Sequence, residues 1–271
     1  MKTLKKLACA AAISVAGVAY AGPTITATND ANTLADAITG TGITISNVTL
    51  TVSGGSATAT GTFTGGAGSV GFDQGIVLTT GTVACAGGTN TLGSCGANLG
   101  GHFDTASLQF DFTSTTGELF FQYVFGSEEY NEFVGSVFND TFQLLLDGVN
   151  IALVPGGGGV VSINNVNCTS NSAYYVNNSS GGTTTCTNQN VPIQYDGLTK
   201  VLTATATVGS GTHHFNFTIS DKGDNGYDSG VFIKAGSFSG SDDQKVPEPG
   251  SLALMALGLT ALVAARRRAA R

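Results

Sequence analysis

Two separate stretches of the chain are rich in carboxylates, and oxygen groups of this kind can hold a hard cation. The first stretch contains Glu128, Glu129, Glu132, Asn139 and Asp140, and the second contains Asp221, Asp224 and Asp228. Calcium takes about six to eight oxygen ligands, chiefly carboxylates and carbonyls on loops. All of these residues except Glu132 form the expected ligand set of a structural calcium site, provided that the fold brings the two stretches together.

The downstream string DKGDNGYD is prone to turns but is not an EF-hand. Gly223 stands where an EF-hand has its third-position acid, and Phe232 stands where it has its closing glutamate. The same acids could instead cap turns and solvate loops. Both interpretations stay open on the residues alone.

Paired carboxylates could also cleave a glycosidic bond, which requires two carboxyl groups about 5 to 9.5 Å apart. Glu128 and Glu129 are adjacent, and neighbours in an extended segment point to opposite sides. Asp228 could act as a partner only if the fold brings it near. A serine hydrolase is not indicated either, because the chain has no G-x-S-x-G elbow. We therefore expect a protein that is not an enzyme.

Three histidines are present, at His102, His213 and His214. His213 shares the parity of Phe215 and Phe217, which predicts a position at a strand end on the apolar face. His214 is then expected to face water.

The elements that must position these side chains are predominantly strands. Apolar residues recur at every second position in residues 43–52, 108–112 and 215–219, with polar residues between them. This period is typical of strands with one face in a core and one in water, so we predict an all-β fold, an antiparallel, jelly-roll-like β-sandwich. Residues 119–125 and 142–146 alternate less, which predicts central strands buried on both faces.

One short helix is expected near the beginning of the folded part, at about residues 32–38. Asp30 or Asn32 could cap it, and the spacing of Leu34 and Ile38 gives it one apolar face. Much later, residues 155–198 form a polar stretch rich in Asn, Ser, Thr and Gly, which predicts a long insertion or loop.

The amino end has the three parts of a secretory signal. Lysines precede an apolar run at residues 7–18, and Ala19, Tyr20 and Ala21 follow it. We expect the translocon to export the chain and signal peptidase to remove residues 1–21, so that Gly22 becomes the first residue.

Export leaves four cysteines in an oxidising compartment: Cys85, Cys95, Cys168 and Cys186. Short loops close most readily, which favours the pairs Cys85 with Cys95 and Cys168 with Cys186. A zinc site is the alternative, but neither pair has the two-residue spacing of zinc ligands.

The carboxyl end reads VPEPGSLALMALGLTALVAARRR. The segment Val246, Pro247, Glu248, Pro249 and Gly250 precedes an apolar stretch at residues 252–265, which ends at Arg266, Arg267 and Arg268. Arginines resist crossing the bilayer, and 14 helical residues span only about 21 Å, so a temporary anchor in the inner membrane fits better than a permanent one. The string resembles the PEP-CTERM sorting signal, which implies cleavage by an exosortase in a Gram-negative bacterium that makes exopolysaccharide.

The region between the two ends, residues 22–245, reads as one domain, followed by a sorting tail at residues 246–271. Its strings GFDQGIVLTTG, DTASLQFDFTS, FQYVFGSEEYNEFVGSVFNDTF and ISDKGDNGYDSGVFIKAGSF resemble, in this order, the choice-of-anchor L domain. The resemblance covers most of residues 30–238 and implies a bacterial surface domain joined to an anchoring signal. It implies no biochemical activity.

Charge excludes one class of partner. Residues 22–249 carry 18 acidic residues against four lysines, a formal charge of −14. A nucleic-acid backbone requires a basic footprint, so we expect no nucleic-acid binding.

We expect an exported protein that passes through a membrane-tethered intermediate to the cell surface or beyond, with a structural or adhesive role associated with exopolysaccharide. The alternative is a carbohydrate-binding module that recognises this polysaccharide, and a glycoside hydrolase ranks third. Six tyrosines could supply stacking faces for sugars: Tyr123, Tyr130, Tyr174, Tyr175, Tyr195 and Tyr227.

Overall fold

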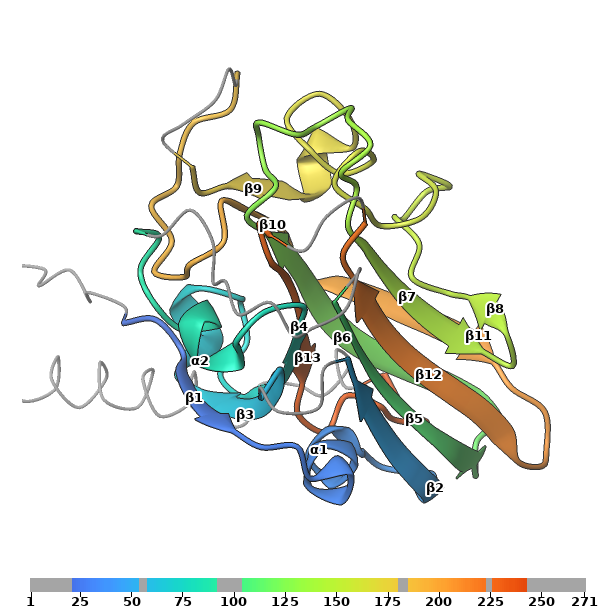
Figure 1. Ribbon diagram of the computed structural model, residues 1–271. Coiled ribbons are helices and arrows are strands. Elements are labelled where there is room, and N and C mark those ends of the chain that lie inside the picture. Colours follow the sequence, from blue (N-terminus) through green and yellow to red (C-terminus); the bar gives the residue numbers. More distant parts are fainter. Residues whose placement is uncertain (1–20, 54–57, 92–103, 180–184, 223–225, 243–271) are drawn as a thin grey trace, which may run out of the picture.

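Two antiparallel sheets form the protein, as the all-β prediction requires (Figure 1). The computed structural model describes residues 21–53, 58–91, 104–179, 185–222 and 226–242. The predicted signal peptide up to residue 20 and the C-terminal apolar helix lie outside these residues. Within them, no helix is long and apolar enough to cross a membrane.

The larger sheet has the order β1-β3-β4-β13-β6-β10-β9, and β11 also pairs with β6. Its strands are β1 (Thr24–Ala27), β3 (Thr60–Thr64), β4 (Gly75–Thr79), β6 (Glu118–Ser127), β9 (Tyr175–Asn177), β10 (Gly197–Thr199), β11 (Leu202–Thr207) and β13 (Ser229–Lys234). The smaller sheet has the order β2-β5-β12-β7-β8. Its strands are β2 (Ile43–Val52), β5 (Thr105–Ser114), β7 (Thr141–Leu146), β8 (Val149–Asn150) and β12 (His213–Ser220).

The core lies between the two sheets and is built from the residues of period two. Phe121 of β6 packs edge-on against Phe215 and Phe217 of β12, with ring centroids 5.5 and 5.6 Å apart. All three rings are buried. Since the alternating apolar positions of both sheets meet here, the sandwich prediction is confirmed.

The expected helix is α1 (Ala31–Ile38), and Asp30 caps it by accepting a hydrogen bond from the Thr33 amide at 2.9 Å. Its buried positions include Leu34 and Ile38, as predicted. One further α-helix, the single turn α2 (Val83–Ala86), was not expected. Four residues are too few for a recognisable helical period.

The two strands predicted to be buried on both faces differ from each other. β6 lies centrally in its sheet, and Tyr123 to Ser127 are buried without a break. β7 instead alternates, with Phe142 and Leu144 buried and Gln143 exposed. That part of the prediction is wrong, because β7 faces the core on one side only.

The polar stretch at residues 155–198 is not simply a loop. It supplies β9 and the beginning of β10, which pairs with β6 and so extends the larger sheet. Ile163, Tyr175 and Tyr195 within it are buried. Its few apolar residues are spread too widely to show a period, which explains why the composition suggested an irregular segment.

The segment after β13 is bonded on two sides. Ser239 and Phe120 of β6 exchange both backbone hydrogen bonds, at 2.8 and 2.9 Å. The amide of Gly240 donates to the carbonyl of Thr41, just before β2, at 2.8 Å. The chain therefore leaves the domain from a position fixed to both the larger sheet and the segment that leads into the smaller one.

Candidate functional site

The buried carboxylates gather at one end of the sandwich. Glu128 follows β6 and Asp228 precedes β13, and these strands pair through Ser127 and Ser229. In the other sheet, Asp140 precedes β7 and Asp221 follows β12, and these strands pair through Thr141 and Ser220. The fold thus brings the two acidic stretches of the sequence to the same end.

Six carboxylates at this end are at most 2% exposed, and we call them the acidic cluster: Asp104, Glu128, Glu129, Asp140, Asp221 and Asp228. Sequence reasoning missed Asp104, which immediately precedes β5. The strand that follows Asp104 was predicted, so the position of Asp104 just before that strand was the one signal that could have identified it. Turn-capping acids are normally exposed to solvent, and this degree of burial does not fit the interpretation of acids that solvate loops.

Asp140 joins the two sheets. One carboxylate oxygen accepts a hydrogen bond from the hydroxyl of Ser229 in β13 at 2.7 Å, and the other accepts from the backbone amide of Lys222 at 2.9 Å. Hydrogen bonds to a charged acceptor are stronger than neutral ones. This carboxylate therefore links the two sheets at the acidic end.

Glu128 and Asp228 are also held in place. The Glu128 carboxylate accepts a hydrogen bond from the Gln194 side chain at 3.1 Å, and the Glu128 amide donates to the carbonyl of Asp228 at 3.0 Å. The Asp228 carboxylate lies against Gly81, where any larger side chain would collide with it. Glycine is therefore required at position 81, because the Asp228 carboxylate approaches the backbone there closely.

Asp221 lies in surroundings that disfavour a charged carboxylate. Its carboxylate lies near the hydroxyl of Thr80 and the carboxyl of Asp140, but neither contact has the geometry of a hydrogen bond. Burial, followed by the charges of Asp140 and Asp228, raises the pKa of Asp221 to about 10. A carboxylate in such a place must either take up a proton or be balanced by a cation.

Not all predicted ligands join the cluster. The carboxamide oxygen of Asn139 accepts a hydrogen bond from the amide of Asn164 at 2.9 Å, and Glu132 is exposed. Asp224 lies outside the described residues. Among the residues that the structure does describe, no three His, Cys, Asp or Glu side chains form a ready-made metal centre.

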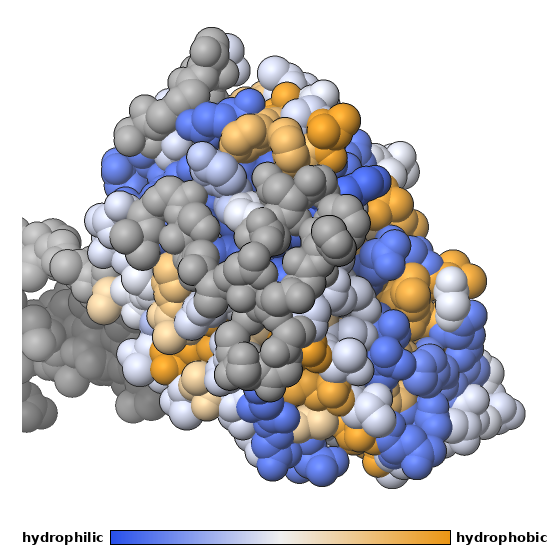
Figure 2. All heavy atoms as spheres, viewed as in Figure 1, coloured by the Kyte–Doolittle hydropathy of each residue, from blue (hydrophilic) through white to orange (hydrophobic). Residues whose placement is uncertain are grey.

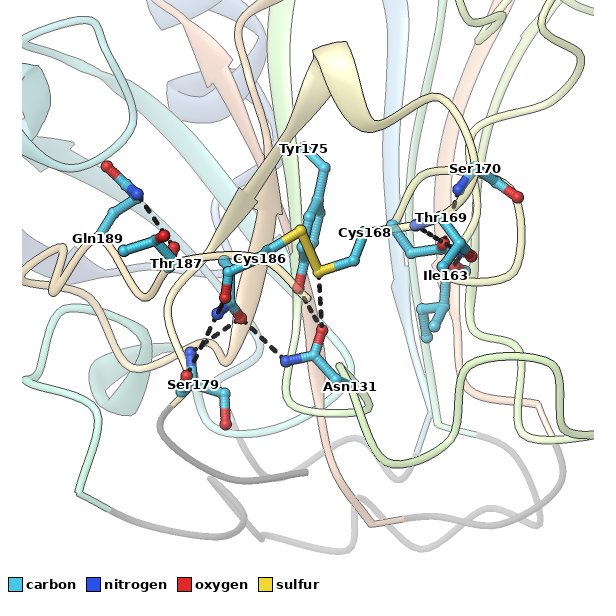
Figure 3. Close-up of a disulfide and its surroundings, with 12 residues drawn as sticks. Asn131, Ile163, Cys168, Thr169, Ser170, Tyr175, Ser179, Cys186, Thr187 and Gln189 are labelled. Carbon is cyan, nitrogen blue, oxygen red and sulfur yellow. Dashed lines mark hydrogen bonds between the residues drawn. A yellow bond between two sulfur atoms is a disulfide. The ribbon is translucent and has the colours of Figure 1, made fainter. Parts of the chain in front are cut away.

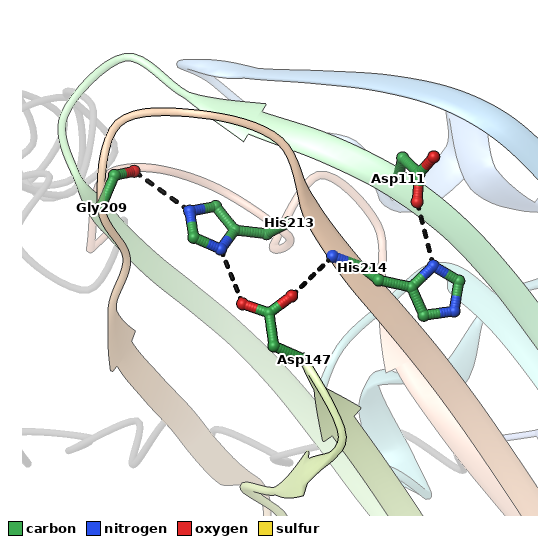
Figure 4. Close-up of polar contacts among 5 residues, drawn as sticks. All are labelled: Asp111, Asp147, Gly209, His213 and His214. Atoms are coloured by element: carbon green, nitrogen blue, oxygen red, sulfur yellow. Dashed lines mark hydrogen bonds and ion pairs between the residues drawn. The ribbon is translucent and has the colours of Figure 1, made fainter.

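The two histidines of β12 lie at the other end of the smaller sheet (Figure 4). Nδ1 of His213 lies 2.7 Å from the Asp147 carboxylate, and its ring packs against Phe112 with centroids 5.6 Å apart. His214 is half-exposed and contacts Asp111 at 2.9 Å. Both orientations agree with the parity prediction, and neither histidine reaches the acidic cluster.

One predicted disulfide is present (Figure 3). Cys168 and Cys186 are bonded, with Cα atoms 5.6 Å apart. Cys95 lies outside the described residues, so its pairing with Cys85 stays a prediction.

A polar cavity of about 210 Å³ lies beside the β9–β10 end of the larger sheet. Seven of the eight side chains around it are polar, and only Val191 is apolar. The lining residues are Thr89, Asn90, Asn178, Ser179, Asn188, Asn190, Val191 and Asp196. Burial raises the pKa of the half-buried Asp196 to about 6, against the hydrogen bond from Asn90, which lowers it.

The tyrosines do not form a sugar-stacking surface. Tyr123, Tyr130, Tyr175 and Tyr195 are buried, and Tyr227 is 40% exposed. For the four buried tyrosines the prediction of a stacking face is wrong, because their rings pack inside the protein; Tyr174 is half-buried.

Comparison with known families agrees with the motifs. Residues 24–239 match the family model of the choice-of-anchor L domain, and residues 245–268 match the PEP-CTERM protein-sorting motif. No curated protein and no solved structure gives a significant match to the chain. Neither matching model is that of a catalytic family.

Proposed function

Because the chain belongs to the choice-of-anchor L domain family, we propose that it serves as a structural or adhesive component of the cell surface, associated with exopolysaccharide. The PEP-CTERM motif marks an exported protein with a cell-surface destination and makes an exosortase its processing partner. The family match ends at residue 239 and the motif begins at residue 245. This arrangement is the observation that carries the proposal, because the sorting motif directly follows a single sandwich domain, which is the part of the chain to be exported.

A non-enzymatic role is supported by the burial of the carboxylates. Glu128 and Glu129 are 2% and 0% exposed, and a glycosidase must bring its two carboxyl groups to the glycosidic bond. A polysaccharide has no access to acids buried in this way. We therefore place the glycoside hydrolase last among the candidate functions.

The route to the surface completes the proposal. The translocon and signal peptidase act first, and cleavage occurs between Ala21 and Gly22. The apolar residues 252–265 then hold the chain in the inner membrane, with the arginines on the cytoplasmic side, until exosortase removes the tail.

The test of this function uses the full chain in a host with an active exosortase. The mature protein should leave the membrane fraction and co-sediment with exopolysaccharide purified from the same host. A chain without Val246–Gly250 should stay in the membrane fraction. Mature protein that remains in the supernatant when the polysaccharide is pelleted would contradict the proposed association.

We further propose that calcium is bound at the acidic cluster and stabilises this end of the sandwich. Two carboxylates about 4 Å apart repel each other by about 4 kcal/mol at an effective dielectric constant near 20. A divalent cation reverses the sign of that interaction. Asp140 precedes β7 and Asp221 follows β12, so the two acids lie at the same end of this strand pair. Asp224, three residues after Asp221 in the sequence, completes the proposed ligand set.

Thermal unfolding with and without calcium tests the calcium proposal. Calcium at about a hundred times its dissociation constant should stabilise the fold by about 2.7 kcal/mol, and a chelator should remove this effect. Asp224→Ala and Glu129→Ala should lose the response, whereas Asp111→Asn, at a half-buried acid outside the cluster, should keep it. An unchanged midpoint in the wild type would show that the cluster is balanced by protons instead.

The polar cavity favours a second candidate function, that of a carbohydrate-binding module. Its lining is rich in carboxamides and hydroxyls, which are the groups that hydrogen-bond sugars.

A further inference from the structure

We infer that the polar cavity beside β9 and β10 binds one neutral sugar ring of the exopolysaccharide. The inference rests on the proposed association with exopolysaccharide and assigns the contact to a defined place. A water molecule occupies about 30 Å³ of liquid volume, so a cavity of about 210 Å³ has room for a molecule of monosaccharide size. Thr89 and Asn190 at its margin are exposed, so that among the described residues this side of the cavity faces solvent.

The wall of the cavity is fixed before any ligand arrives. Asn178 donates to the carbonyls of Ile193 and Tyr195 at 3.1 and 2.9 Å and accepts from the amide of Val191 at 2.6 Å. The Cys168–Cys186 disulfide holds the same segment two residues before Asn188 (Figure 3). A preorganised wall lowers the entropy that binding must cost.

Several polar atoms around the cavity remain available to a ligand. Asn90 uses both protons of its carboxamide, one on the carbonyl of Asn178 at 3.1 Å and one on the Asp196 carboxylate at 2.5 Å, which leaves its oxygen as an acceptor. Asn188 accepts from the amide of Asn190 at 2.7 Å, which leaves its NH₂ group as a donor. Within the described residues, the Asn190 side chain makes no hydrogen bond.

This set of groups selects the class of ligand. Carboxamides both donate and accept hydrogen bonds, and the Asp196 carboxylate accepts them. Each sugar hydroxyl also does both, so adjacent hydroxyls can satisfy such a wall. None of the eight lining residues is basic, and Asp196 would repel an anion. The cavity therefore suits neutral hexoses or N-acetylated sugars rather than uronic acids, phosphates or sulfates.

The test uses the mature protein purified from a host with an active exosortase. Binding of glucose, galactose, mannose, N-acetylglucosamine and glucuronic acid is measured by titration calorimetry, and binding of the host's purified exopolysaccharide by co-sedimentation. At least one neutral sugar should bind, and glucuronic acid should not. Asp196→Asn and Asn190→Ala should each weaken binding by about tenfold or more, since the first replaces a charged acceptor with a weaker neutral one and the second removes a carboxamide.

Gln189→Ala provides the matched control. Gln189 is an exposed carboxamide between Asn188 and Asn190 that does not line the cavity, so its loss should leave sugar binding unchanged. If the mature protein co-sediments with exopolysaccharide and neither Asp196→Asn nor Asn190→Ala weakens this, the cavity assignment is wrong while the proposed function stands. If the wild type does not co-sediment at all, the proposed function itself fails.

Discussion

At the scale of single residues, the contact between His213 and Asp147 makes part of the stability depend on pH. The hydrogen bond that the His213 ring donates to the Asp147 carboxylate raises the pKa of His213, against a smaller opposing effect of burial. Burial raises the pKa of Asp147, but the hydrogen bonds from His213 and the His214 amide outweigh it and lower that pKa overall. Each group thus favours the charged form of the other.

The signs of these shifts define a pH window. A histidine with a raised pKa in the folded state stabilises the protein fully below its unfolded pKa of about 6.5 and loses this effect as the pH rises through the folded value. The Asp147 contribution is present above about pH 3.9 and is lost as the pH falls through its lowered folded pKa. The pair therefore stabilises the fold most between about pH 4 and 6.5.

His213→Gln should remove this dependence. When the pH rises from 6 to 8, the free energy of unfolding of the wild type should fall by up to about 1 kcal/mol relative to that of the variant. The value is small because Asp147 is half-exposed. Denaturant unfolding of both proteins at each pH measures the difference, in which the other titrating groups cancel. A difference that stays constant from pH 5 to 8 would show that the contact contributes nothing to stability.

The acids show what residue-level reasoning can and cannot reach. Their positions beside predicted strand ends were correct for Glu128, Asp140, Asp221 and Asp228. Their burial could not be predicted, because it depends on how the two sheets stack, and no local pattern encodes that. The same limit applies to Tyr195, whose exposure depends on contacts distant in sequence.

At the scale of elements, the Cys168–Cys186 disulfide closes a segment with a sequence separation of 18 around β9. Replacing both cysteines by serine should lower the free energy of unfolding by about 3 kcal/mol, because the open chain gains conformational entropy when unfolded. Equilibrium unfolding in denaturant measures this change. Thr187→Ser, at an exposed neighbour, should have almost no effect, and a double serine variant as stable as the wild type would show that β9 and β10 need no covalent support.

Phe238 should be among the most sensitive core positions. Its ring is fully buried and lies 5.1, 5.1 and 5.0 Å from the rings of Phe110, Phe112 and Phe215. Phe238→Ala should cost about 3–5 kcal/mol, measured by denaturant unfolding, and the milder Phe238→Leu serves if the alanine variant does not fold. Val149→Ala, at an exposed position, should change stability by less than about 0.5 kcal/mol. Equal effects at the two positions would contradict the packing described here.

At the scale of the whole molecule, the two ends of the sandwich differ in character. The acidic cluster and the polar cavity lie at the Ser127 end of β6, because Ser127 pairs with Gly197 and Ser229. The chain leaves the domain near the opposite end of β6, where Phe120 holds Ser239. A ten-residue strand is about 30 Å long, so the proposed ligand-binding end lies far from Ser239, close to which the described part of the chain ends.

Processing at both ends is the prediction for the complete chain. Intact-mass measurement of the mature protein should show the loss of residues 1–21 and of the basic end through Arg271. Arginines that remain attached in a host with active exosortase would contradict tail removal, and a host that lacks exosortase serves as the control.

The fold class and the sorting motif could be predicted because each has a local signal, namely apolar residues of period two and a contiguous string. The pairing of β9 and β10 could not, since these strands have only three residues each. The distribution of polar and apolar side chains on the surface could not be predicted from the sequence either. Polar and apolar side chains are interspersed over the visible face, with apolar groups gathered toward its right side (Figure 2).

The double attachment of Ser239 and Gly240 also decides how the domain would respond to mechanical force. Tension applied through the carboxyl end of the domain reaches this segment first, where backbone hydrogen bonds to Phe120 on one side and to Thr41 on the other share the load. The hydrogen bonds to Phe120 and to Thr41 must both break before the force can pull β13 from its sheet. A protein held by its carboxyl end in flowing water would therefore resist extension at the very place where the pull enters.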